Sequence, residues 1–362
     1  MAGELWCYWA QPGGVAEGRV VLEPIVQRAS ERDTSEDLAL ARYALGAVLG
    51  NQGEYAGSAR MLSLALRTFE SAEDGPRAAL CHLQLGRIAA NSGTPRTAHI
   101  HLRAALRAFV RLDDPFGRMQ TWLAMGESAV RQLHLSEAER LFRRAVVGSR
   151  QQRYRVGLAR AHMGLAIVWM RRADFDRAEQ HTARALRLRH KAGNDWGIPS
   201  ILSIIGSIAA MRGDLQRART TYEECLTRYQ LQGHVDGVTV VLHNLGDLAW
   251  STGDVPRAEG YYVDAFAMPH LSGPMRAWLA YRLAEISLIK GDLGQAEQWI
   301  EESLDGARKA EIEDVQAEAL RMQGQLLGRR GQHDRAAACV MESLTIWRRF
   351  GGDGGALRAR GV

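Results

Sequence analysis

A histidine and an aspartate lie four positions apart at His243 and Asp247. Residues four apart share one face of a helix, so this pair could act as a base and the group that orients it. Catalysis would also need a nucleophile or oxyanion donors, and the surrounding sequence offers neither. We therefore predict no catalytic residues and favour a non-enzymatic role. The simpler interpretation is that both residues lie on the surface of a helix within a repeated motif.

The possible ligands for a metal or cofactor are poorly spaced. His99 and His101 are two apart and would lie on different faces of a helix. Neither the HExxH zinc motif nor the GxxxxGK(S/T) phosphate loop occurs. We predict no cofactor and no metal site. The cysteines lack CxxC spacing and are interpreted as small packing residues in a reducing compartment, at Cys7, Cys81, Cys225 and Cys339.

The charge pattern limits the classes of partner. The 362 residues carry a net charge of +5, and basic and acidic side chains are interspersed, which disfavours a nucleic-acid interface. The start of the chain does not resemble a signal peptide. The longest uncharged run, Trp196–Met211, contains Pro199 and Gly206 and is too short to span a bilayer. We predict a cytoplasmic protein without a membrane partner.

A period of about 40 residues runs through most of the chain. Ala, Leu, Arg, Glu and Gln dominate and strand-like alternation is rare, so the repeated elements are predicted to be helices. One position of the period is always small, at Gly46, Gly86, Gly126, Ala166, Gly206, Gly246, Ala284 and Gly324. Seven residues later comes a turn position, at Gly53, Gly93, Leu133, Ala173, Gly213, Gly253, Gly291 and Gly331. Further small residues recur five and twelve residues after each turn position.

Each repeated position has a physical interpretation. The first small residue is expected where two helices cross too closely for a large side chain. The turn glycine is expected to end the first helix in a left-handed conformation. Thr94 and Pro95 are expected to start a second helix as cap and first helical residue. The predicted aspartate caps of other second helices are Asp174, Asp214, Asp254 and Asp292.

These offsets resemble the tetratricopeptide repeat, whose small residues have the same internal spacing in a shorter unit of about 34 residues. The resemblance covers nearly the whole chain and implies an all-α, right-handed solenoid of tetratricopeptide-like helical hairpins. We expect a degenerate repeat in residues 1–34 and eight repeats forming one solenoid in residues 35–350. A Gly-rich tail, residues 351–362, would start a truncated ninth unit.

The opening segment contains Leu5, Trp6, Trp9, Gly13, Glu17, Gly18, Arg19, Leu22 and Glu23. These residues resemble the start of the repeat region in bacterial STAND-type transcriptional regulators, where an ATPase module precedes the repeats. The resemblance implies a region that senses a signal or binds a partner and controls the ATPase or a DNA-binding domain.

In tetratricopeptide arrays the first helices of the hairpins line the concave face. The resemblance predicts a groove whose one end is basic and methionine-rich and whose other end is aromatic and acidic. We predict that this groove recognises a protein or peptide, in bacterial regulation or complex assembly. The alternative is a small-molecule sensor or atypical enzyme using the enclosed groove. The groove residues are Glu127, Arg131, Arg160, Met163, Ile167, Met170, Arg171, Ser203, Ser207, Met211, His243, Asp247, Trp250, Trp278, Tyr281 and Glu285.

Two smaller features have competing interpretations. Trp250 and Trp278 are equally suited to recognition and to core packing. The basic stretch Arg143–Arg155 is better explained as a solvated helix face than as a phosphate site.

Pro269 is expected to end a second helix early, within a unit of 38 residues. Many co-chaperone tetratricopeptide domains hold a terminal carboxylate with an Asn directly after the Leu-Gly pair, and because no unit has it, we predict no such clamp.

Overall fold

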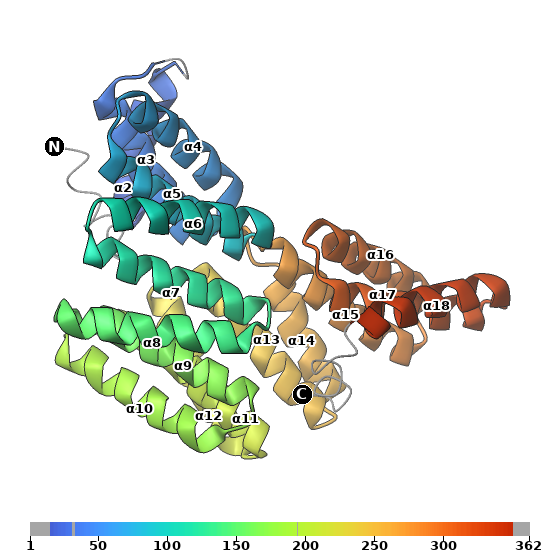
Figure 1. The fold of residues 1–362 in the computed structure, drawn as a ribbon. Helices are drawn as coiled ribbons and strands as arrows, with labels where there is room; N and C mark the ends of the chain where they lie inside the picture. Colours follow the sequence, from blue (N-terminus) through green and yellow to red (C-terminus); the bar gives the residue numbers. More distant parts are fainter. Residues whose placement is uncertain (1–14, 31–32, 194, 350–362) are drawn as a thin grey trace. The chain divides into compact units, whose positions relative to one another are not determined.

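The computed structural model describes residues 15–30, 33–193 and 195–349, and every regular element within them is helical (Figure 1). This confirms the predicted all-α solenoid class. The opening residues Leu5 to Gly13 and the tail from Gly351 lie outside the described residues. The chain divides into two compact units, residues 1–237 and 238–362, and each is described by itself. The prediction that residues 35–350 form one solenoid stays a prediction.

Unit 1 contains a short 3-10 helix, Asp195–Gly197, and the α-helices α2 (Val15–Arg28), α3 (Glu36–Asn51), α4 (Tyr55–Ser71), α5 (Gly75–Asn91), α6 (Pro95–Arg111), α7 (Pro115–Arg131), α8 (Leu135–Gln151), α9 (Arg155–Arg171), α10 (Phe175–Lys191), α11 (Ile198–Arg212) and α12 (Leu215–Leu231). Helix α13 (Val235–Ser251) begins at the end of unit 1 and continues into unit 2. Unit 2 also contains α14 (Val255–Phe266), α15 (Gly273–Lys290), α16 (Leu293–Lys309), α17 (Glu313–Arg329) and α18 (His333–Arg349).

Most helices are joined by the same three-residue turn. The predicted turn positions Gly53 and Gly93 have φ of 83° and 82°, in the left-handed region that glycine adopts without strain. Leu133 and Ala173, at the same position of their units, take φ of 59° despite their side chains. From α4 to α10 the helices are 17 residues long and begin 20 residues apart, because each turn has the same length.

Aspartate side chains begin many of these helices. The four predicted caps are confirmed: Asp174, Asp214, Asp254 and Asp292 each accept a hydrogen bond from the backbone N–H three residues later, at 3.0–3.2 Å. Thr94 occupies the N-cap position of α6 as predicted, but its hydroxyl donates to the carbonyl of Ala89 (3.1 Å) and forms no capping hydrogen bond. Pro95 does occupy the first turn of α6, as predicted.

The first small residue of each unit lies where the two helices of a hairpin cross. A Cβ added at Gly126 would lie 2.7 Å from the Phe142 ring, and one added at Gly206 would lie 2.6 Å from the Tyr222 ring. These aromatic residues follow their glycines by 16 positions, and both are buried. Where Ala166 takes the place of glycine, the residue 16 positions later is the smaller Thr182. The prediction of close crossing is therefore confirmed.

The first helices of successive hairpins contact one another. In unit 1, α5 packs against α7, α7 against α9, and α9 against α11, and in unit 2, α15 packs against α17. Their partners in the hairpins, such as α6, α8 and α10, each pack against the first helix before them and the first helix after them. Helix α14 ends at Phe266, before Pro269, as predicted. The predicted groove residues lie on these first helices, and we call the faces that carry them the inner faces.

We expect Gly206→Ala to lower the free energy of unfolding by about 1–3 kcal/mol, because its new methyl group must displace the Tyr222 ring. Gly260→Ala in α14 is the matched control, since a Cβ there meets no atom within 4 Å. We expect it to be stabilising by about 0.5–1 kcal/mol through helix propensity. Urea unfolding monitored by circular dichroism measures both. Equal effects of the two substitutions would contradict the crossing argument.

Candidate functional site

The predicted groove residues of unit 1 lie on three successive first helices. Helix α7 carries Glu127 and Arg131. Helix α11 carries Ser203, Ser207 and Met211. The residues on α9 are Arg160, Met163, Ile167, Met170 and Arg171.

Three arginines surround one carboxylate on this surface, and we call Arg87, Arg131, Arg160 and Glu127 the arginine cluster. Arg160 donates from Nη2 to Glu127 Oε1 (2.7 Å), which joins α9 to α7. Arg131 donates to Asn91 Oδ1 (2.6 Å) and so joins α7 to α5. Because the residues come from three neighbouring hairpins, the stacking of repeats builds the cluster.

The charges within the arginine cluster are unequal. Burial alone would raise the pKa of Glu127, but the charges of Arg160 and Arg87 and the hydrogen bond from Arg160 lower it below its ordinary value. Burial, followed by the charge of Arg160, lowers the pKa of Arg87. Among the described residues, Arg87 makes a side-chain hydrogen bond to Gln84 Oε1 (3.3 Å) and no ion pair. Glu127 is therefore ionised, and the cluster carries an excess of positive charge.

The methionine-rich part of the predicted groove is largely packed. Met170 is 8% exposed and belongs to a core cluster with Ile204 and Ile208. Met163, Ile167 and Met211 pack against that cluster and remain half-buried. Met170 therefore serves the core, whereas the other three present part of their surface to the inner face.

The two predicted serines and the last arginine differ in their bonding. The Ser207 hydroxyl donates to the Ser203 carbonyl (2.9 Å) and accepts from the Tyr222 hydroxyl (3.0 Å). Arg171 is exposed at the end of α9 and makes no hydrogen bond or ion pair with the described residues. Its guanidinium group is therefore free to pair with a carboxylate of a partner.

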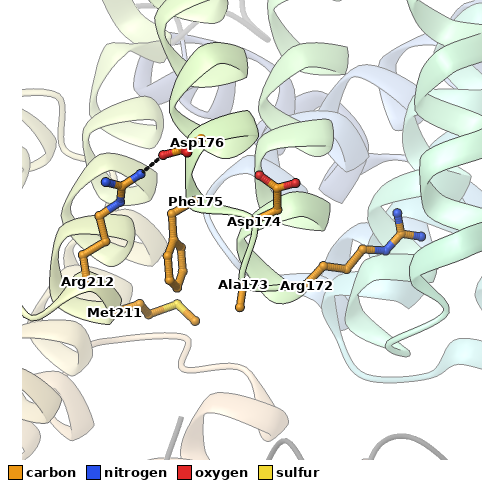
Figure 2. A pocket seen from close by; sticks show the side chains of 7 residues that line it. All are labelled: Arg172, Ala173, Asp174, Phe175, Asp176, Met211 and Arg212. Carbon is orange, nitrogen blue, oxygen red and sulfur yellow. Dashed lines mark hydrogen bonds and ion pairs between the residues drawn. The ribbon is translucent and has the colours of Figure 1, made fainter.

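An open pocket of about 680 Å³ lies where the α9–α10 turn approaches the end of α11. Figure 2 shows the Phe175 ring beside the Met211 thioether, with Arg212 reaching to Asp176. Asp174 is engaged in capping α10. The charged groups around the pocket are thus largely paired, and Phe175 and Met211 contribute the larger apolar side chains of its lining.

In unit 2, the predicted His243–Asp247 pair belongs to a larger polar network. Asp247 accepts a hydrogen bond from the Tyr262 hydroxyl (2.7 Å) and lies 3.1 Å from Arg282 Nε. His243 Nε2 lies 3.7 Å from Asp247 Oδ2, which is within ion-pair range and too long for a hydrogen bond. The structure brings the two residues together but gives the carboxylate other partners.

The network keeps the Asp247 carboxylate ionised, which suits a structural anion better than a proton acceptor in catalysis. Burial alone would raise the pKa of Asp247, but the charges of His243 and Arg282 and the Tyr262 hydrogen bond lower it. Burial and the charge of Asp247 raise the pKa of Tyr262. Arg282 also pairs with Glu285 (3.2 Å), so both carboxylates have a cationic neighbour. The arrangement holds α13, α14 and α15 together and shows no group positioned as a nucleophile.

The aromatic residues predicted for unit 2 take different positions. Tyr281 is 8% exposed, lies in the core and meets Trp278 edge to face, with ring centroids 5.7 Å apart. Trp278 packs against that core and remains half-buried, as does Trp250. Trp278 and Trp250 therefore keep surface for a partner, whereas Tyr281 acts mainly in packing.

Several residues of these sites were missed from the sequence. Arg87 occupies the same position in its unit as Glu127 and Asp247, so its register could have identified it. Asn91 likewise shares its position with Arg131. Arg282 had no such indication, because the corresponding positions in other units do not carry a repeated charge.

Two histidine pairs were also missed, although their spacing repeats. His82 and His101 place their Nδ1 atoms 2.9 Å apart, and His162 and His181 do the same. The residues of each pair are 19 positions apart, and the pairs are separated by 80 positions, which is two units. The sequence analysis considered His101 only beside His99, on a different face of the same helix, whereas its contact is with His82 on the neighbouring helix.

Burial lowers the pKa of all four histidines. For His162, burial and the charge of His181 lower the pKa to about 4, and Arg184 and Arg150 act in the same direction. A neutral pair can share one N–H between the two Nδ1 atoms, whereas two imidazolium rings have no acceptor for each other. The charged groups that face His181 are Arg184, Arg143 and Glu139.

We expect the free energy of unfolding of the protein to decrease as the pH falls, because the folded state disfavours protonation of His162. The unfolded chain binds this proton near pH 6.5 and the folded chain only near pH 4, so the stability contributed by neutral His162 is lost between these values, by about 3 kcal/mol. Urea unfolding of the wild type and His162→Gln across this range should give converging stabilities at low pH. The exposed His134→Gln is the control, and parallel curves for wild type and His162→Gln would contradict the argument.

Metal sites and membrane spans are two further classes of feature that the described residues lack. No three His, Cys, Asp or Glu side chains in this part of the chain lie close enough together to hold a metal ion. None of the described helices combines the length and apolarity that a membrane span requires.

The repeat family is identified by comparison with known proteins. Residues 197–269 and 275–359 match the tetratricopeptide repeat family model. This part of the chain consists of tetratricopeptide repeats. No curated protein matches the sequence.

Solved tetratricopeptide-like structures share the fold of this chain at low sequence identity. A Rap protein complexed with Competence and Sporulation Factor has 12% identity and a TM-score of 0.59, covering 87% of this chain and 99% of its own. NprR in complex with its cognate peptide NprX has 15% identity and a TM-score of 0.56, covering 82% and 88%. Aspartyl phosphate phosphatase F from Bacillus subtilis has 13% identity and a TM-score of 0.51, covering 95% and 93%. These likenesses concern the fold alone.

Proposed function

We propose that this chain is a non-enzymatic binding module that recognises a protein or peptide through the inner faces of its first helices. The observation that carries the proposal is the arginine cluster, where side chains from three successive hairpins converge on one accessible surface. Arg171 occupies the same position in its unit as Arg131. It adds a cation that has no partner among the described residues. A surface that many repeats build together suits an extended partner.

The fold neighbours support this proposal without deciding it. NprR was solved with its cognate peptide, and a Rap protein was solved with Competence and Sporulation Factor. A peptide ligand is therefore compatible with this architecture. The Asp247 network, with its carboxylate occupied by Tyr262 and Arg282, favours binding over catalysis.

We place this module in bacterial regulation or complex assembly, inside the cytoplasm, with repeating units of 40 residues. The opening residues that resemble STAND-type regulators motivate this context. In such a setting, partner binding to the inner face would control an attached or associated protein.

Selection from a random peptide library displayed on phage tests the proposal with the full chain. Selected peptides should cross-link to a photoreactive benzoylphenylalanine placed at Arg171 on the inner face. The matched control places the same group at Arg103, which is exposed on α6, a second helix. Cross-linking from position 103 alone, or a selection that yields no binding peptide, would contradict the proposal.

A small-molecule sensor is the second candidate, and the pocket beside Phe175 and Met211 favours it. Its open volume, in which Phe175 and Met211 lie beside charged side chains, suits a small molecule with both an apolar and a polar part. A Phe175→Ala variant should abolish binding of such a compound while leaving the selected peptides bound, because Phe175 lines the pocket and is not one of the groove residues.

A further inference from the structure

The arginine cluster contains more positive charge than its own carboxylate can balance. Arg160 is paired with Glu127, and Arg131 is bonded to the Asn91 side chain and to the Glu127 backbone carbonyl (3.3 Å). Neither Arg131 nor Arg87 forms an ion pair with the described residues. Three guanidinium groups therefore face Glu127, while Tyr55, which interacts with Arg131, donates its hydroxyl to a second carboxylate, that of Asp236 (2.8 Å).

These charges remain within reach of a partner. Arg87 and Arg160 are half-buried, with 23% of the Arg160 side chain exposed, and Arg131 is exposed. Glu127 keeps 36% of its side chain exposed. Partly desolvated arginines bind carboxylates more strongly than fully solvated ones, and the guanidinium fork suits two carboxylate oxygens.

The side chains beside the arginines suit a polypeptide backbone. Gln84, Asn91 and Gln120 offer their carbonyl oxygens to the arginines. Their amide N–H groups make no hydrogen bond with the described residues and can donate to peptide carbonyls.

Resting on the proposed function, we propose that the arginine cluster binds a segment of polypeptide carrying at least two neighbouring Asp or Glu side chains. The incoming carboxylates pair with Arg87 and Arg131, and one of them competes with Glu127 for Arg160. Glu127 thereby acts as a resident anion that holds Arg160 in place and limits affinity for the acidic partner.

Competition by Glu127 predicts that removing its charge increases the affinity for an acidic peptide. Glu127→Gln removes a negative charge from the cluster and frees Arg160, so it should strengthen binding of an acidic peptide. If Glu127 served only to hold the repeats together, the same substitution would weaken binding or leave it unchanged. A gain in affinity also shows that the variant is folded.

Fluorescence anisotropy with the full chain provides the test. The probes are a fluorescein-labelled peptide containing Glu-Asp-Glu in a neutral frame and its Gln-Asn-Gln counterpart. We expect the acidic probe to bind at least ~10-fold more tightly, with affinity falling as salt rises. Arg87→Gln should weaken it by ~10-fold or more, Glu127→Gln should tighten it by several-fold, and the exposed Arg103→Gln on α6 should leave it within about 2-fold.

Three results would overturn the inference. Equal binding of the acidic and amide probes would show that charge does not drive recognition. Weaker binding by Glu127→Gln would show that Glu127 does not compete with the acidic peptide. Displacement of the acidic probe by a single-stranded oligonucleotide of higher affinity would assign the cluster to nucleic acid. If the acidic probe fails while display-selected peptides still cross-link at position 171, the inference fails and the proposed function stands.

Discussion

The close crossing of the two helices in each hairpin is the constraint on which the rest of the structure depends. At Gly126 and Gly206 there is no room for a Cβ, because the rings of Phe142 and Tyr222 occupy that space. The crossing fixes the distance between the helices and therefore the direction in which the first helix presents its other face. A change at this point would shift the inner surface of its own hairpin and the contact with the next.

Uniform turns extend this local constraint along the chain. Left-handed residues at Gly53, Gly93, Leu133 and Ala173 end successive first helices in the same way. Equal helix lengths then bring equivalent positions of neighbouring units together. The pairing of Arg131 with Asn91, 40 residues apart, is a direct result of this register.

The same scaffold supports different polar chemistry in different repeats. The inner face of unit 1 carries an excess of arginine around Glu127, whereas Asp247 in unit 2 is balanced by Arg282 and hydrogen-bonded by Tyr262. Between the helices of two hairpins in unit 1, paired histidines replace the usual small or apolar contacts. Unpaired charge is available to a partner, while the balanced network stabilises its own helices.

The sequence by itself determined the helical class, the crossing glycines, the turn positions and the aspartate caps. These features depend on local geometry, which repeats along the chain and leaves the same residue types at the same offsets. It also placed Glu127, Arg131 and Arg160 on one predicted surface, because register alone assigns a face to each residue. Thr94 shows the limit even locally, since its hydroxyl had two possible partners and took the carbonyl of Ala89.

Only the tertiary structure decided which side chains meet. The contacts of Arg160 with Glu127, His162 with His181 and Arg282 with Asp247 join different helices, and no local rule specifies them. They depend on how closely the helices pack and on which rotamers remain open once the core is filled. Packing likewise buried Met170 and Tyr281, which register had placed on the groove, because a position on the inner face does not determine how much of a side chain its neighbours cover.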